Sequence, residues 1–138
     1  MRHVALFIPT RIHLGEPTFF LQLRDRAAPI YPNRIGLFGG HLEPGETPDQ
    51  AVVREAAEEL SVCGAPFALA GHHHVCRHEE LGSIRDIYLV RVDDAFAQGV
   101  QVHEGDGGVW LTADEIASEP RVVDLIRALL PLLARAEA

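Results

Sequence analysis

The sequence reads GGHLEPGE at residues 39–46 and REAAEE at residues 54–59. A short apolar segment, 35–38, precedes the first stretch and is predicted to be a strand that stops at the glycine pair. The second stretch lies in a predicted helix, Pro48–Leu60, for which Thr47 is the expected N-cap. Glycines let a backbone turn sharply and approach a ligand closely. A strand, a glycine loop and an acidic helix in this order indicate an oxygen-rich pocket.

The predicted helix concentrates negative charge on one side. At about 100° per residue, Glu55, Glu58 and Glu59 span one arc, and Val52, Val53 and Ala56 lie on the side expected to pack. Two interpretations are open. The arc is an ordinary solvated acidic face, or it is a site for a hard cation such as Mg²⁺, which prefers carboxylate oxygens.

The spacing of these residues resembles a known family signature. The segment from Gly40 to Val62 is similar to the Nudix box, G-x5-E-x7-R-E-U-x-E-E-x-G-U, in which U is aliphatic. The fixed positions that match are Gly40, Glu46, Arg54, Glu55, Glu58 and Glu59. Ser61 departs from the pattern, because it stands where the family usually has the glycine that ends the helix.

The resemblance implies a set of site residues. In it, Glu55, Glu58 and Glu59 are metal-binding and catalytic carboxylates, and the carbonyl of Gly39 is a further metal ligand. Glu46 and Arg54 match supporting residues of the catalytic machinery, with Arg54 holding the helix and a glutamate in register. A further metal ligand is expected from a later loop, where Glu104 is the first choice and Asp106 the second. Two alternatives stay open: the ligand is Glu79 or Glu80, which lie on another loop, or Glu104 is an ordinary solvated acid.

The resemblance also implies a function. We expect a Mg²⁺-dependent Nudix pyrophosphohydrolase, with Mn²⁺ as a substitute ion, that cleaves the diphosphate of a nucleoside diphosphate linked to another group. The candidates are a nucleoside triphosphate, a nucleotide sugar and a dinucleoside polyphosphate. The alternative is a catalytically silent Nudix-like domain that binds a nucleotide as a regulator. The intact glutamate set favours the enzyme, because a silent domain has no chemical need for it.

Other residues near the glycine loop are candidates for substrate contact. They are Gly40, His41, Arg24 and Arg34, the arginines because a guanidinium matches phosphate geometry. The aromatic side chains Phe19, Phe20 and Trp110 suit either base stacking or a core.

Histidine and cysteine alternate along a later stretch of the chain, where one histidine is also a candidate for the substrate pocket. His72, His74, Cys76 and His78 are expected to share one face of a strand, either as a zinc site or as a polar outer face with a buried thiol.

Outward from the box, the chain mixes strands and helices. The expected elements are strands at His3–Pro9, Thr18–Leu23, Phe67–Arg77, Ser83–Val92 and Val109–Leu111, a loop at Asp93–Gly108, a short helix capped by Thr112 and Glu115, and a last helix from Ser118 or Glu119 that Pro131 kinks or ends. Together they predict one domain over residues 1–138, of the α/β (α+β) class, folded as an αβα sandwich around a mixed sheet.

Composition limits the partners. The net charge is −8, and all 12 basic residues are arginine, so we expect no nucleic acid polymer as a partner. No apolar run approaches a membrane span and no cleavage site follows the N-terminus, so we expect no membrane association and a cytoplasmic location. Cys63 and Cys76 are too few for a disulfide framework. The expected partner is a small-molecule nucleoside diphosphate derivative, and a homodimer stays open.

Overall fold

The structure is a computed structural model, and it describes residues 2–29 and 31–137. Its helices are α1 (Pro48–Glu59), α2 (Asp94–Gly99), α3 (Ala113–Ser118) and α4 (Asp124–Glu137). Its strands are β1 (Arg2–His13), β2 (Glu16–Leu23), β3 (Ile35–Gly36), β4 (Phe38–His41), β5 (Leu60–Val62), β6 (Ala65–Pro66), β7 (His73–Glu80), β8 (Ser83–Arg91), β9 (Val100–Val102) and β10 (Gly108–Thr112). No helix in these residues is long and apolar enough to cross a membrane.

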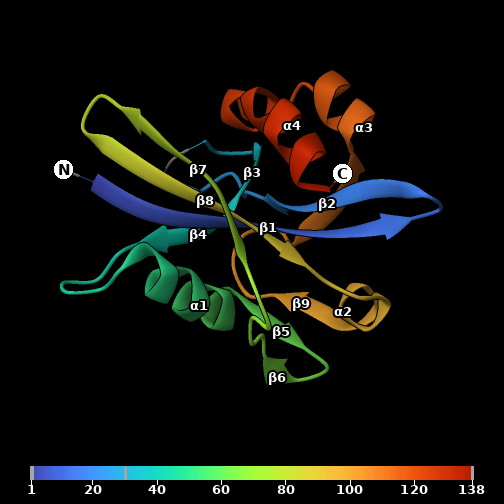
Figure 1. The fold of residues 1–138 in the computed structure, drawn as a ribbon, viewed down its shortest axis with the longest axis horizontal. Coiled ribbons are helices and arrows are strands. Elements are labelled where there is room, and N and C mark those ends of the chain that lie inside the picture. Colours follow the sequence, from blue (N-terminus) through green and yellow to red (C-terminus); the bar gives the residue numbers. More distant parts are fainter. Residues whose placement is uncertain (1, 30, 138) are drawn as a thin grey trace.

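A mixed sheet forms the middle layer, with α1 below it and α3 and α4 above it in Figure 1. The strand order is β10-β2-β1-β8-β7, and β1 and β8 are the parallel pair. The predicted αβα sandwich around a mixed sheet is therefore confirmed. A separate small sheet, β6-β5-β9, continues from the end of α1.

Strands β1 and β2 separate at one end of the sheet. They pair with each other over Thr10–His13 of β1. Earlier in β1, β4 pairs with Val4–Phe7, and β3 pairs with the end of β2 at Gln22 and Leu23. The glycine pair lies inside β4, so the expectation that it stops the strand is wrong. The ladder with β1 extends across Gly39 and Gly40, because backbone pairing does not depend on a side chain.

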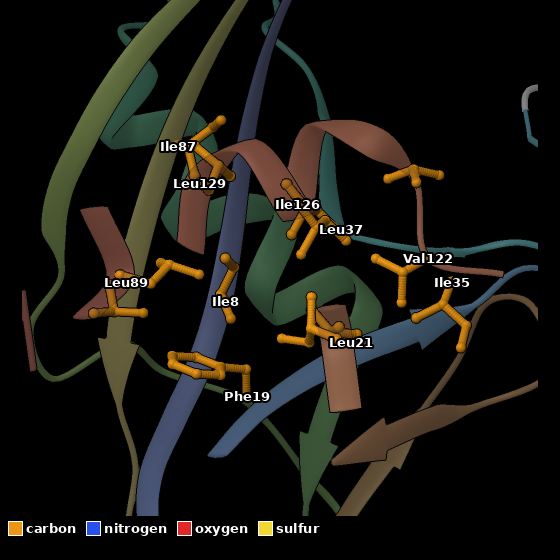
Figure 2. Packing of buried hydrophobic residues seen from close by; sticks show 13 residues of the cluster. Ile8, Phe19, Leu21, Ile35, Leu37, Ile87, Leu89, Val122, Ile126 and Leu129 are labelled. Carbon is orange, nitrogen blue, oxygen red and sulfur yellow. The ribbon is translucent and has the colours of Figure 1, made fainter. Parts of the chain in front are cut away.

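Each face of the sheet has its own core. Ile8, Leu21 and Ile87 pack with Ile126 and Leu129 of α4, as Figure 2 shows. On the opposite face, the core below the sheet contains Phe7, Phe20, Phe38, Val52 and Ala56. Alternate residues of a strand point to opposite faces, so odd and even positions of β2 belong to different cores. The aromatic side chains of Phe19 and Phe20 are core residues in this arrangement.

The capping boxes at Thr47 and Thr112 are both present. The expected loop 93–108 is wrong in its first part, where Asp93 caps α2 and β9 follows. Short polar elements of this kind carry little periodicity to detect. Pro131 lies inside α4, so it does not end that helix.

Two further element boundaries differ from expectation. The predicted strand at 67–77 begins instead at His73 and runs to Glu80. The last helix begins at Asp124, several residues after its expected start.

The packing side of α1 is rotated from the expected one. Val53 is 43% exposed, whereas Ala51, Val52, Ala56 and Glu59 are buried. The pattern of apolar residues misled here because alanine and valine are tolerated at the surface, while a glutamate is buried only when its carboxylate has partners. The helix therefore presents one of its glutamates to the protein interior, next to the glycines of β4.

Candidate active site

Glycine is required at the point where β4 meets α1. A Cβ atom on Gly40 would lie 2.6 Å from Oε1 of Glu55, so a larger residue would displace that carboxylate. Gly39 has φ +130°, a conformation that L side chains rarely adopt. The two glycines let the helix carboxylates approach the strand backbone.

Arg54 connects the loop to the helix. Its Nε donates to Glu46 at 2.8 Å, and its Nη2 donates to the carbonyl of His41 at 2.9 Å. Its Nη1 donates to Glu55 at 3.0 Å and to Glu58 at 3.2 Å. The hydrogen bond from Arg54 lowers the pKa of Glu46 to about 2, and the same contacts raise the pKa of Arg54. One guanidinium therefore fixes the loop and two glutamates of α1.

Glu59 is the most enclosed of the helix carboxylates, with 5% exposure. Its Oε2 accepts the backbone N–H of Gly39 at 2.7 Å. Burial and the adjacent carboxyl of Glu104 raise the pKa of Glu59 to about 9. Burial also raises the pKa of Glu55, and the charges of Glu58 and Glu104 add to this. Negative charge at this place exceeds what Arg54 compensates.

The loop that carries Glu104 is held against α1 by its neighbours. The N–H of His103 donates to the carbonyl of Glu59 at 2.8 Å, and the His103 ring lies 2.8 Å from the Ser61 hydroxyl. Ser61 also donates to Gln101 at 3.2 Å. The residue that departs from the family pattern thus helps to hold the loop, a role that the sequence did not indicate for Ser61 or His103.

The carboxylates suit a hard divalent cation. Within residues 2–29 and 31–137, no group of three or more acidic, histidine or cysteine side chains already stands at metal-binding spacing. Glu55, Glu59 and Glu104 nevertheless lie close enough for each to perturb another, and all three line one cavity. Carboxylate oxygens are the ligands that Mg²⁺ prefers, and a cation would relieve their repulsion. The donor set therefore fits Mg²⁺ or Mn²⁺.

The cavity has a volume of about 720 Å³. Gly39, Gly40, His41 and Arg24 line it, as do Arg54 and the three carboxylates. Arg34 lies outside this lining, because its guanidinium donates to the carbonyls of Arg121 and Val122. Glu58 is more exposed than the other two helix glutamates. The structure thus brings together most of the residues that the resemblance implied.

The other candidate acids lie elsewhere. Asp106, Glu79 and Glu80 do not line this cavity, and Glu80 instead pairs with Arg85 at 3.2 Å. Trp110 contacts the ring of Phe20 within the core below the sheet.

The expected shared face of the histidines and Cys76 is wrong. A bulge between His74 and Cys76 shifts the register, so that His74 is opposite Tyr88 while Cys76 is opposite Ile87. Those partners belong to different cores, and the bulge therefore separates the side chains onto the two faces of the sheet. This separation leaves the zinc interpretation without its geometric basis.

Comparison with known proteins identifies the family. A model of the NUDIX domain matches residues 1–133. The chain is 32% identical over 108 residues to the CTP pyrophosphohydrolase of Escherichia coli, covering 76% of this chain and 74% of that protein. It is 29% identical over 120 residues to an uncharacterized Nudix hydrolase of Yersinia pestis, covering 86% of this chain and 63% of that protein, so it spans less than two thirds of that relative's length.

Solved structures share the fold. The NUDIX domain of Shewanella oneidensis NrtR, complexed with ADP ribose, superposes with a TM-score of 0.75 at 15% identity, over 99% of this chain and 88% of that one. With the family model spanning almost the whole sequence, the chain belongs to the NUDIX family.

Proposed function

We propose that this chain is a divalent-metal-dependent pyrophosphohydrolase. The observation that carries the proposal is the group of carboxylates from Glu55, Glu59 and Glu104, which faces a cavity with only partial compensation from Arg54. Burying uncompensated charge is costly, so such a group is retained where it binds a cation. Mg²⁺, when bound there, neutralises phosphate oxygens and activates water for attack on phosphorus.

The residues of the chain have separate tasks in this proposal. Glu55, Glu59 and Glu104 hold the cation, and one of the helix glutamates accepts the proton of the attacking water. Arg54 orients Glu55 and Glu58 through hydrogen bonds of 3.0 and 3.2 Å. Glycine at position 40 leaves the space that the Glu55 carboxylate occupies. Arg24, which lines the same cavity, binds a phosphate oxygen.

The proposed substrate is a nucleoside diphosphate linked to another group. The similarity to a CTP pyrophosphohydrolase supports a nucleoside triphosphate as the first compound to test. A nucleotide sugar and a dinucleoside polyphosphate are the other candidates, because the box acts on the diphosphate and the rest of the cavity selects what is attached to it.

A second function is a nucleotide-binding domain without catalysis. The observation that favours it is the fold similarity to the NUDIX domain of NrtR, which was solved with ADP ribose. The intact carboxylate group favours the enzyme.

The test is a panel of these substrates with Mg²⁺, in which release of phosphate and pyrophosphate is followed. We expect turnover of at least one compound, and a loss of about a hundredfold or more in Glu55→Gln. Glu16→Gln is the matched control, because Glu16 is an exposed acid at the start of β2 and does not line the cavity. Nucleotide binding without turnover of any compound would contradict the enzyme and support the regulatory domain.

A further inference from the structure

A row of nitrogen-bearing side chains crosses four strands at one end of the sheet. The pairing register places His41 of β4 opposite Val4 of β1, Val4 opposite Arg85 of β8, and Arg85 opposite His78 of β7. Directly paired residues point to the same face of a sheet. The side chains of His41, Arg85 and His78 therefore lie on one face in a single row.

This row lies on the face that α4 covers. Alternate residues of a strand point to the same face, so Val4 lies on the same face as Leu6 in β1, and Arg85 on the same face as Ile87 in β8. Leu6 and Ile87 both pack in the core that α4 covers. Arg2 is two residues before Val4, so it points to the same face, diagonally across from Arg85. Arg2, Val4, His41 and Arg85 all line the large cavity.

The cavity lining contains both acidic and basic side chains. Its acidic lining residues are Glu43, Glu55, Glu59 and Glu104, and they come from the loop before α1, from α1 and from the loop after β9. The charged or titratable side chains that the sheet row and Arg2 contribute to the lining are arginine and histidine. Apolar side chains line the same cavity, among them Leu6, Leu37 and Leu125.

The two arginines keep donors available. Arg85 uses Nη1 for Glu80 at 3.2 Å and for Nδ1 of His78 at 3.3 Å. Its Nε and Nη2 make no hydrogen bond within residues 2–29 and 31–137, and the guanidinium of Arg2 pairs with no side chain in the same part of the chain. These donors are available to a bound anion, which a guanidinium can bind through two parallel hydrogen bonds.

We propose that Arg2, His41 and Arg85 form an anion subsite for the end of the substrate that is farthest from the diphosphate. The proposal rests on the proposed function and narrows its substrate class to diphosphate compounds with a second phosphate or carboxylate. Leu6, Leu37 and Leu125, which line the same cavity, offer apolar contacts to the uncharged part of the substrate. A nucleotide phosphorylated on its ribose as well as at the 5′ position has this arrangement.

The test is calorimetry with pairs of compounds that differ by one phosphate. The probes are adenosine, guanosine and cytidine 3′,5′-bisphosphates, each against its 5′-monophosphate, with Mg²⁺ present. None contains a phosphoanhydride bond, so binding is measured without hydrolysis. We expect the bisphosphate to bind about tenfold more tightly in at least one series, as expected for charge-assisted hydrogen bonds.

Variants of the two arginines test whether they cause the preference for the bisphosphate over the monophosphate. Arg85→Gln and Arg2→Gln are expected to reduce the ratio of the two affinities to about one to three, and Arg85→Lys to retain part of it, because lysine keeps the charge and loses the planar fork. Arg91→Gln is the matched control, since Arg91 is on the same face of β8 about 20 Å along the strand. Thermal melting of each variant verifies that the fold is kept.

The outcomes separate this proposal from the proposed function. A wild-type ratio near one in all three series, an unchanged ratio in the Arg2→Gln/Arg85→Gln double variant, or no binding of any bisphosphate would overturn the anion subsite. Where the bisphosphate is preferred, a parallel preference for carboxylate-bearing probes such as nucleotide uronic acids over their neutral sugars would show that the subsite also accepts a carboxylate. Hydrolysis of a nucleoside triphosphate would stand in each case.

Discussion

Two clusters of charged residues on the α1 side of the sheet shift the pKa of a buried carboxyl group in opposite directions. Asp86 is 2% exposed and accepts hydrogen bonds from His3 at 2.6 Å, His74 at 2.8 Å and Arg77 at 3.1 Å. Burial alone would raise the pKa of Asp86, but these donors outweigh it and lower that pKa to about 2. Glu59 is almost as buried, and its pKa rises to about 9.

The difference lies in the neighbours. Asp86 is one carboxylate among three donor side chains, so its charge is compensated within the protein. Glu59 has a single backbone donor and lies beside other carboxylates. A buried acid with enough partners stabilises the fold, whereas one without them indicates a ligand that the protein itself does not supply.

The largest effect is expected at the uncompensated cluster. Glu59→Gln keeps an oxygen that accepts the Gly39 N–H and removes the carboxylate that a bound cation would require. We expect turnover to fall about a hundredfold or more, with thermal stability of the metal-free protein unchanged or increased. Steady-state kinetics and melting are measured on the same preparation. Full activity of this variant at saturating Mg²⁺ would remove Glu59 from the metal site.

The reverse result is expected at Asp86. Asp86→Asn leaves Arg77 and the two histidines without their common anion, and should lower the free energy of unfolding by about 2 to 3 kcal/mol. Denaturant titration measures this, and turnover per folded molecule should not change. Because the pKa of Asp86 is lowered, its contribution is present above about pH 4 and is lost as the pH falls toward 2. A variant that loses activity but not stability would show that the two clusters are not separate.

The smallest effect is expected for a single donor to Asp86. The side chain of His74 is 45% exposed, and Asp86 keeps His3 and Arg77 when it is removed. His74→Ala should therefore lower the free energy of unfolding by about 1 kcal/mol or less. Denaturant titration beside Asp86→Asn gives the comparison. A loss as large as that of Asp86→Asn would mean that His74 alone accounts for the cluster.

The sequence predicted the position of the site better than it predicted which side of each helix or strand is buried. The spacing from Gly40 to Glu59 is local, so it located α1, its cap and the carboxylates that line the cavity. The bulge in β7 is visible only when β8 is paired beside it, and it moved Cys76 away from His74. The burial of Glu59 was missed because it depends on the Gly39 N–H, which is 20 residues away in the chain.

The hydrogen-bond and ion-pair partners of individual side chains were harder to predict from the sequence than the residues of the glycine loop and the acidic helix. Asp86 showed no local signal, because its donors come from three places in two other strands, β1 and β7. Arg34 had the same local features as Arg24, yet its contacts to the segment before α4 place it outside the cavity. The roles of Ser61 and His103 likewise depend on contacts between segments about 40 residues apart in the chain.

The most direct test of an uncompensated carboxylate cluster is a Mg²⁺ titration of the metal-free protein by calorimetry at several pH values. Because the pKa of Glu59 is raised to about 9, metal-free protein holds its proton at neutral pH and must release it when the cation binds. We predict that Mg²⁺ affinity rises with pH up to about 9, with release of roughly one proton near neutrality, and that Glu59→Gln abolishes this release. An affinity independent of pH between about 6 and 9, with no proton released by the wild-type protein, would contradict the account.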